Sequence, residues 1–181
     1  ETDGSTSDSQ TFTTTTAGTA NKGPNSFTSS NNYDTGIVPV SSDVLYVENS
    51  AISILYDLSS TGVILDALHI AQNFTGTIGL PERNAGGYAE YRPTYLQVGS
   101  DIVRIGYGTG SGSGRIKLDL GTAQTAISVL NSGRTAAETG VEQILIKANN
   151  SSNSLQVLKG VVGLSIVTNT TGNFSGGVSI G

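Results

Sequence analysis

The sequence contains no cysteine, methionine or tryptophan, and it has one histidine and four prolines among its 181 residues. Without cysteine, a disulfide scaffold and a thiolate metal site are excluded, and one imidazole is too few for a zinc site. Charged residues make up only 13% of the chain, which argues against a coiled coil. The lack of thiols suits an oxidising exterior, so we expect a location outside the cytoplasm.

Positive charge is also scarce, because 9 Lys and Arg stand against 14 Asp and Glu and give a net charge of −5. This balance offers no electrostatic basis for wrapping nucleic acid or coating an anionic membrane. The apolar runs are far shorter than the roughly 20 residues that span a bilayer. We therefore expect no nucleic-acid partner, no membrane partner and no cofactor.

The residues that dominate are small and polar, with 24 Gly, 23 Ser and 22 Thr. Residues 1–40 contain few large apolar side chains and include a run of four threonines at 13–16. Such a composition cannot bury enough surface to order itself alone. We expect an extended Ser/Thr-rich N-terminal arm over 1–40 and a β domain over 41–181.

Within the expected β domain, short apolar segments with period-two alternation recur between Gly, Asn and Ser. The expected strands are 44–47, 52–56, 95–98, 102–105, 116–120, 126–130, 144–146, 155–158 and 164–167. Segment 63–72 is compatible with a helix or a strand, and its β-branched residues favour a strand. Neither Asn-Gly nor Asp-Gly, the usual hairpin dipeptides, occurs in 41–181. The fold class is therefore all-β, with an irregular parallel β-solenoid favoured and an antiparallel β-sandwich or jelly roll as the alternative.

Three features that resemble catalytic or binding motifs have simpler interpretations. The glycine array at 106–114 precedes a strand rather than a helix, so we interpret it as a flexible connector and not as a phosphate cradle. His69 lies between Leu68 and Ile70 and is interpreted as a structural histidine. The carboxylates that a sugar-cleaving enzyme would need are scattered, and we assign none of them a catalytic role. The candidates were Asp57, Asp66, Glu82, Glu90, Asp101 and Asp119.

The densest cluster of chemically distinctive side chains lies at 81–95, where three of the seven tyrosines accompany two arginines and two glutamates. Tyr and Arg concentrate in protein interfaces because they combine large contact area with directional hydrogen bonds. We therefore predict a subunit contact. Its residues are Tyr88, Glu90, Tyr91, Arg92 and Tyr95. The alternatives are a loop whose tyrosines cover the edge of the core, and a glycan-binding loop.

The segments 27–39 and 43–47 resemble the opening of bacterial β-solenoid passenger and surface proteins. Phe27 and Tyr33 occupy the places where those proteins usually carry Trp, and Asn32, Gly36, Pro39 and Asp43 keep the pattern. The resemblance implies a β-solenoid fold whose entry is formed by these segments.

The segments 74–81, 90–96 and 110–120 resemble uncharacterised proteins encoded among the structural genes of tailed phages and prophages, and this similarity extends over residues 43–167. It implies a non-enzymatic virion protein of capsid-decoration or head-fibre type, anchored by the arm, with the capsid protein, further copies of itself and a cell-surface glycan as candidate partners. A secreted or cell-surface bacterial adhesin of β-solenoid type is the first alternative. A tailspike-like enzyme that degrades polysaccharide is the second.

Overall fold

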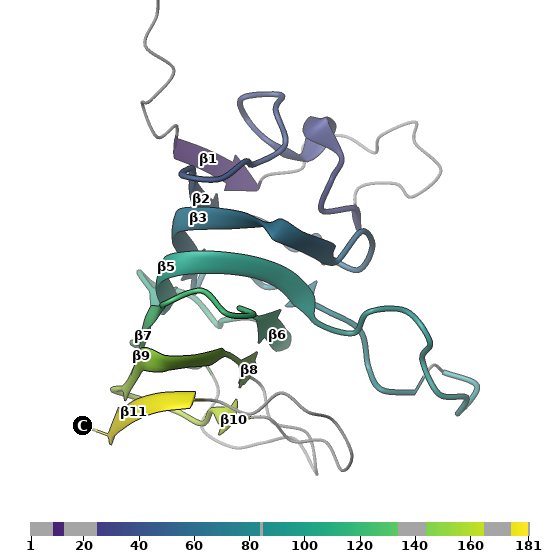
Figure 1. The fold of residues 1–181 in the computed structure, drawn as a ribbon. Helices are drawn as coiled ribbons and strands as arrows, with labels where there is room; N and C mark the ends of the chain where they lie inside the picture. The colour runs from purple at the N-terminus through teal and green to yellow at the C-terminus, as the bar shows by residue number, and fades with distance from the viewer. Residues whose placement is uncertain (1–8, 13–24, 84, 134–143, 165–174, 181) are drawn as a thin grey trace, which may run out of the picture.

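The computed structural model describes residues 9–12, 25–83, 85–133, 144–164 and 175–180, and over these residues the protein is almost entirely β (Figure 1). The strands are β1 Ser9–Phe12, β2 Val44–Val47, β3 Ser59–Ala71, β4 Thr77–Ile78, β5 Leu96–Tyr107, β6 Arg115–Asp119, β7 Ala126–Val129, β8 Ile144–Lys147, β9 Asn149–Val157, β10 Gly163–Leu164 and β11 Ser175–Ile180. Within the described ranges no residue is in an α-helix, and a short 3-10 turn, η2, spans Ser30–Asn32. The prediction of an all-β fold is confirmed.

Most predicted segments coincide with observed strands. The ambiguous segment 63–72 lies in β3 except for Gln72, and the separate segments 95–98 and 102–105 join in β5 except for Tyr95. Segment 52–56 contributes only isolated bridges, through Ile54 and Tyr56, rather than a strand. Of segment 164–167, Leu164 ends β10 and the remaining residues lie outside the described part of the chain.

All pairs between the named strands are parallel, and they form two ladders of paired strands. The first ladder aligns Leu45 with Leu68, Val103, Ile127 and Leu155, and so contains β2, β3, β5, β7 and β9; β1 and β11 extend it. The second ladder pairs β4 with β6, β6 with β8 and β8 with β10, and the first two residues of β5, Leu96 and Gln97, also pair with β6 and so link the ladders. From β3 onward the named strands alternate between the two ladders along the chain, and the strands succeed one another in tiers from β1 to β11 (Figure 1).

The core lies between the ladders and consists of aliphatic side chains in register. Successive side chains of a strand point to opposite sides, so alternate residues of every strand in a ladder line the same side. On the first ladder the inner residues Leu68, Val103 and Ile127 are at most 1% exposed, and on the second Ile116 and Ile144 are at most 3% exposed. Full burial of one such side chain contributes roughly 1.5–3 kcal/mol, so each tier adds its own share of stability.

Residues 25–40 belong to the β domain, which corrects the expected boundary of the arm at residue 40. Phe27 and Tyr33 are at most 4% exposed and pack edge to face, with ring centroids 6.3 Å apart. The Tyr33 hydroxyl donates a hydrogen bond to the Phe27 carbonyl, and burial raises the Tyr33 pKa. The amide of Phe27 donates to the carbonyl of Tyr56. Two buried aromatic rings thus help to fix a segment that is rich in small polar residues.

The glycine array at 106–114 is a packed turn and not a loose connector. The amide of Gly112 donates to the Gln72 carbonyl at 2.8 Å, and the Ser113 hydroxyl donates to the Gly76 carbonyl at 2.5 Å. Gly106 has a φ of +82°, and a Cβ at this position would lie 1.7 Å from the Asn131 carbonyl oxygen. The glycines therefore allow the turns of successive tiers to approach closely.

Among the residues that the structure describes, no helix is long and apolar enough to cross a membrane.

Candidate contact site

A loop formed by residues 81–94 projects from the tiers between β4 and β5 (Figure 1). Its two ends meet where the Leu80 amide donates to the Thr94 carbonyl at 2.9 Å. Gly79 permits this closure because its φ is +91° and a Cβ there would lie 2.5 Å from the Thr94 oxygen. Within the loop, the Glu90 amide donates to the Glu82 carbonyl, and Arg83 and Ala89 form an antiparallel bridge. The loop is therefore a narrow, backbone-bonded projection.

Two basic side chains from β6 hold the base of the loop. The Lys117 Nζ donates to the Leu80 carbonyl at 3.0 Å and forms an ion pair with Glu82 at 2.5 Å. The Arg115 guanidinium donates to the Gly79 carbonyl at 3.1 Å. The Lys117 side chain is only 3% exposed, and this burial lowers its pKa, although Glu82 opposes the shift. A buried charge with two acceptors fixes the base firmly.

Tyr95, which we expected at the interface, is buried at the base of the loop, and this part of the prediction is corrected. It is 3% exposed, and its ring lies 4.7 Å from the Lys117 Nζ and 3.8 Å from the Lys147 Nζ. Tyr95 therefore covers the outer side of the second ladder and receives two lysines on its ring. The alternative in which a tyrosine covers the edge of the core applies to this residue.

Glu90 and Arg92 form a two-point ion pair on the returning arm of the loop. The Arg92 Nε and NH2 donate to the two Glu90 oxygens at 2.9 and 2.7 Å, and the Arg92 amide donates to the same carboxylate. These bonds lower the Glu90 pKa to about 2 and raise the Arg92 pKa. The pair stiffens the loop internally, so neither side chain presents an unbalanced charge to a partner.

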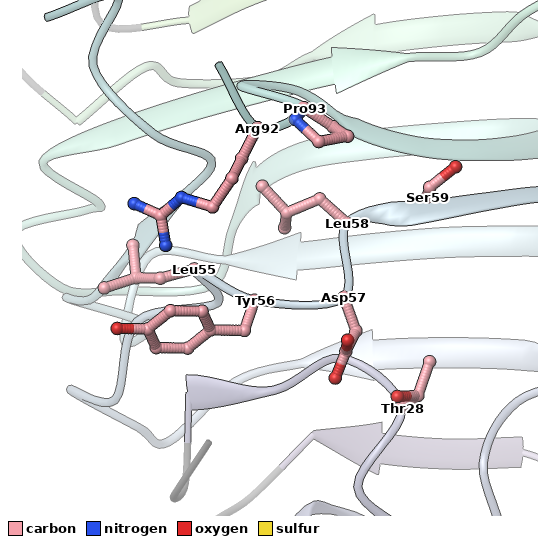
Figure 2. A pocket seen from close by; sticks show the side chains of 8 residues that line it. All are labelled: Thr28, Leu55, Tyr56, Asp57, Leu58, Ser59, Arg92 and Pro93. Carbon is pink, nitrogen blue, oxygen red and sulfur yellow. The ribbon is translucent and has the colours of Figure 1, made fainter. Parts of the chain in front are cut away.

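A pocket of about 410 Å³ lies beside this ion pair (Figure 2). Its lining residues are Thr28, Leu55, Tyr56, Asp57, Leu58, Ser59, Arg92 and Pro93. The Arg92 guanidinium carbon lies 5.5 Å from the centre of the Tyr56 ring, a cation–π distance. Asp57 accepts a hydrogen bond from the Ser26 hydroxyl. The pocket thus joins the N-terminal segment, the turn before β3 and the returning arm of the loop.

Tyr88 and Tyr91 remain as the accessible part of the predicted interface. They are 76% and 94% exposed, the largest exposures among the large hydrophobic residues that the structure describes. The structure therefore divides the predicted set by role, with two tyrosines on the surface, an ion pair in the returning arm and one tyrosine in the base. Sequence reasoning missed Lys117 and Arg115, because nothing in the alternation of β6 indicates that a loop covers its outer side.

The remaining carboxylates of the hypothetical enzyme have ordinary surroundings. Glu82 pairs with Lys117, and Asp119 accepts a hydrogen bond from the Gly121 amide at 3.1 Å. Asp66 and Asp101 are exposed on the first ladder. Over the described ranges, no group of three or more His, Cys, Asp or Glu side chains is arranged to hold a metal ion.

Comparisons of the chain with protein-family models, with curated proteins and with solved structures found no match.

Proposed function

We propose that the two ladders are walls of an irregular parallel β-solenoid, in which the chain makes one circuit per tier. The parallel pairing of the named strands supports this architecture over a sandwich, whose neighbouring strands would be antiparallel. The circuits differ in length, since 24 residues separate Val103 from its ladder partner Ile127 and 28 separate Ile127 from Leu155. Variable turns outside a constant aliphatic core account for the absence of an exact sequence repeat.

The function that best fits this architecture is that of a non-enzymatic structural protein displayed on a virion, of capsid-decoration or head-fibre type. A parallel stack is a stiff support, and the exposed Tyr88 and Tyr91 at the end of an anchored loop carry the proposal. Exposed tyrosines on a fixed base are suited to an interface, because little side-chain freedom is lost when they are covered. The partner is another virion protein, such as the capsid protein, or a second copy of this chain.

In this proposal the N-terminal arm still anchors the protein, but the arm is shorter than the sequence predicted. Residues 25–40 pack on the β domain, and β1 pairs with β2. The anchor to the particle is therefore assigned to the residues before Asn25 other than β1, and the loop supplies a separate contact.

The proposal is tested by mass spectrometry of purified particles, followed by particles made with a Tyr88→Ala/Tyr91→Ala variant. The double variant should lower occupancy on the particle at least about tenfold, which corresponds to about 1.4 kcal/mol, since truncation of a central interface tyrosine commonly costs about 2 kcal/mol. The matched control is Ile37→Ala/Val40→Ala, which removes two side chains that are 58% and 56% exposed elsewhere. The control should leave occupancy unchanged.

Three outcomes contradict the proposal. Normal attachment of the double variant would show that the loop is not a contact. Absence of the protein from particles, with secretion to the cell surface instead, would favour the adhesin. Release of reducing sugar from a polysaccharide by the purified protein would favour the tailspike-like enzyme.

A further inference from the structure

A second pocket, of about 350 Å³, lies on the outer side of the first ladder and is formed without any residue of the loop. Its lining residues are Tyr46, His69, Arg104, Tyr107, Ser128 and Leu130. They come from β2, β3, β5, β7 and the residue after β7. The pocket therefore extends across four neighbouring strands, and we call it the outer groove.

Strand register aligns one wall of the outer groove. Tyr46 pairs with His69, His69 with Arg104 and Arg104 with Ser128. Their neighbours along each strand are the buried aliphatic residues of the core, so alternation directs these four side chains outward. Adjacent strands lie about 4.8 Å apart, a spacing comparable to the length of one sugar ring in a polysaccharide chain. An elongated ligand lying along the tiers would meet one outward side chain at each step.

The aromatic part of the groove is held in place. The Tyr46 and His69 rings are stacked, with centroids 4.9 Å apart and planes 27° apart, and Tyr107 meets His69 edge-on at 6.1 Å. The Tyr107 hydroxyl donates to Glu48 at 2.6 Å. This bond pairs the Glu48 carboxylate with Tyr107 and holds the Tyr107 ring in position. The groove therefore has a fixed wall of aromatic rings, and the aliphatic side chain of Leu130 lies beside it.

Arg104 is the charged group of the groove. It is exposed, and among the residues that the structure describes its guanidinium has neither a hydrogen bond nor an ion pair. Its positive charge acts on His69, whose pKa is lowered first by burial and then by Arg104. An arginine without a counter-ion beside fixed aromatic rings offers two parallel N–H donors to an incoming anion.

We propose that the outer groove binds an acidic saccharide, with a sugar carboxylate paired to Arg104 and the apolar faces of the sugar rings packed on Leu130 and the aromatic side chains. The Ser128 hydroxyl lies one strand beyond Arg104 and can bond a sugar hydroxyl. This is a binding site separate from the proposed loop contact.

The backbone around the groove disfavours an acidic peptide as the ligand. Extended peptides bind chiefly by adding a strand to a sheet edge. The strands under the groove, β3, β5 and β7, are each paired on both sides, so they present side chains and no unpaired edge. A nucleic acid is disfavoured as well, because one arginine in a chain of net charge −5 cannot neutralise a row of phosphates.

The test is titration of the whole chain with oligogalacturonate and with sialylated oligosaccharides, followed by calorimetry and NMR. At least one acidic saccharide should bind. Its carboxyl methyl ester should bind at least tenfold more weakly, because esterification removes the charge and leaves the sugar rings intact. The Arg104→Gln variant should also bind the acidic saccharide at least tenfold more weakly. The Arg83→Gln variant, which changes an arginine on the loop, should bind it as the wild type does. Unchanged urea midpoints will show that both variants fold.

The proposal is overturned if no acidic saccharide binds at millimolar concentration, if the methyl ester binds equally well, or if polyglutamate binds as tightly as the saccharide. Equal binding by Arg104→Gln would also overturn it. The Tyr88→Ala/Tyr91→Ala variant should keep its saccharide affinity, so failure of the groove and failure of the loop contact are distinguishable.

Discussion

At the scale of single residues, Lys117 shows how a charge can be buried in a chain with few charges. Its side chain is 3% exposed, while that of its partner Glu82 is 54% exposed. Burial of an ammonium group carries a large desolvation penalty, which the ion pair, the Leu80 carbonyl and the Tyr95 ring offset. The two partners should therefore respond differently to mutation.

Lys117→Met should change the free energy of unfolding by less than about 1 kcal/mol, because it replaces a buried charge with an apolar chain of similar length and leaves Glu82 able to reach water. Glu82→Ala should cost about 2 kcal/mol, because it leaves the ammonium buried with only the carbonyl as acceptor. Urea denaturation of both variants measures the difference. Equal losses would mean that the packing of the lysine stem, and not the charge pair, holds the loop base.

His69 should make stability depend on pH. Burial and the charge of Arg104 lower its pKa in the folded state below the ordinary value of 6.5. As the pH falls below 6.5, the unfolded chain takes up a proton at His69 while the folded chain resists it, so stability decreases. The groups that face this imidazole are Arg104, Tyr46 and Tyr107, with Glu48 bonded to Tyr107.

The unfolding free energy of the wild type should therefore fall more between pH 7.5 and pH 5.5 than that of His69→Gln. Titration of the carboxylates affects both proteins alike and cancels in the comparison. Urea unfolding at the two pH values measures it. An equal fall in both proteins, or a larger fall in the variant, would contradict the predicted role of His69.

At the scale of elements, the end of β5 and the turn that follows it decide how closely two tiers approach. Gly106 and Gly108 both have positive φ, at +82° and +74°, but only Gly106 lies against the backbone of Asn131; a Cβ on Gly108 would meet nothing within 4 Å. A comparison of substitutions at the two glycines therefore distinguishes the cost of the backbone conformation from the cost of lost packing.

Gly108→Ala should cost about 1 kcal/mol, the strain of a left-handed alanine. Gly106→Ala should cost at least about 2 kcal/mol more, because the added methyl group overlaps the Asn131 carbonyl and the turns must separate. Thermal or urea unfolding of the two variants measures the difference, and recovery of only aggregated Gly106→Ala protein would agree with it. Similar stabilities would show that the turn adjusts easily and that close packing is not required.

The sequence predicted the strands better than it predicted the turns and the site. The alternation of apolar residues such as Leu45 and Val47 with other residues shows directly which side of a strand faces the core, because it depends only on the local pleat of the strand. The packing of Gly106 against Asn131 and the burial of Tyr95 under two lysines depend on neighbours 22 or more residues away. The polar composition of residues 25–40 also led to the wrong prediction of an extended arm, because two buried rings, Phe27 and Tyr33, attach this segment to the core.

At the scale of the whole molecule, we expect stability to be local, because each strand contacts chiefly the strands that pair with it above and below. In such a stack the free energy is close to a sum over tiers and their interfaces. The outer groove and the loop lie on different ladders, so changes in one should leave the other intact. The molecule can therefore carry two surface sites on one continuous core.

The loop at 81–94 lies within an interval of 38 residues between ladder partners Thr77 and Arg115, whereas 28 separate Ile116 from Ile144, and the parallel pairing of β4, β6 and β8 continues across both intervals. The loop at this corner can therefore gain or lose residues without shifting the strand register of the second ladder. In evolutionary terms, we expect this corner to tolerate insertions and substitutions, because the aliphatic rows that form its support do not depend on the exposed stretch.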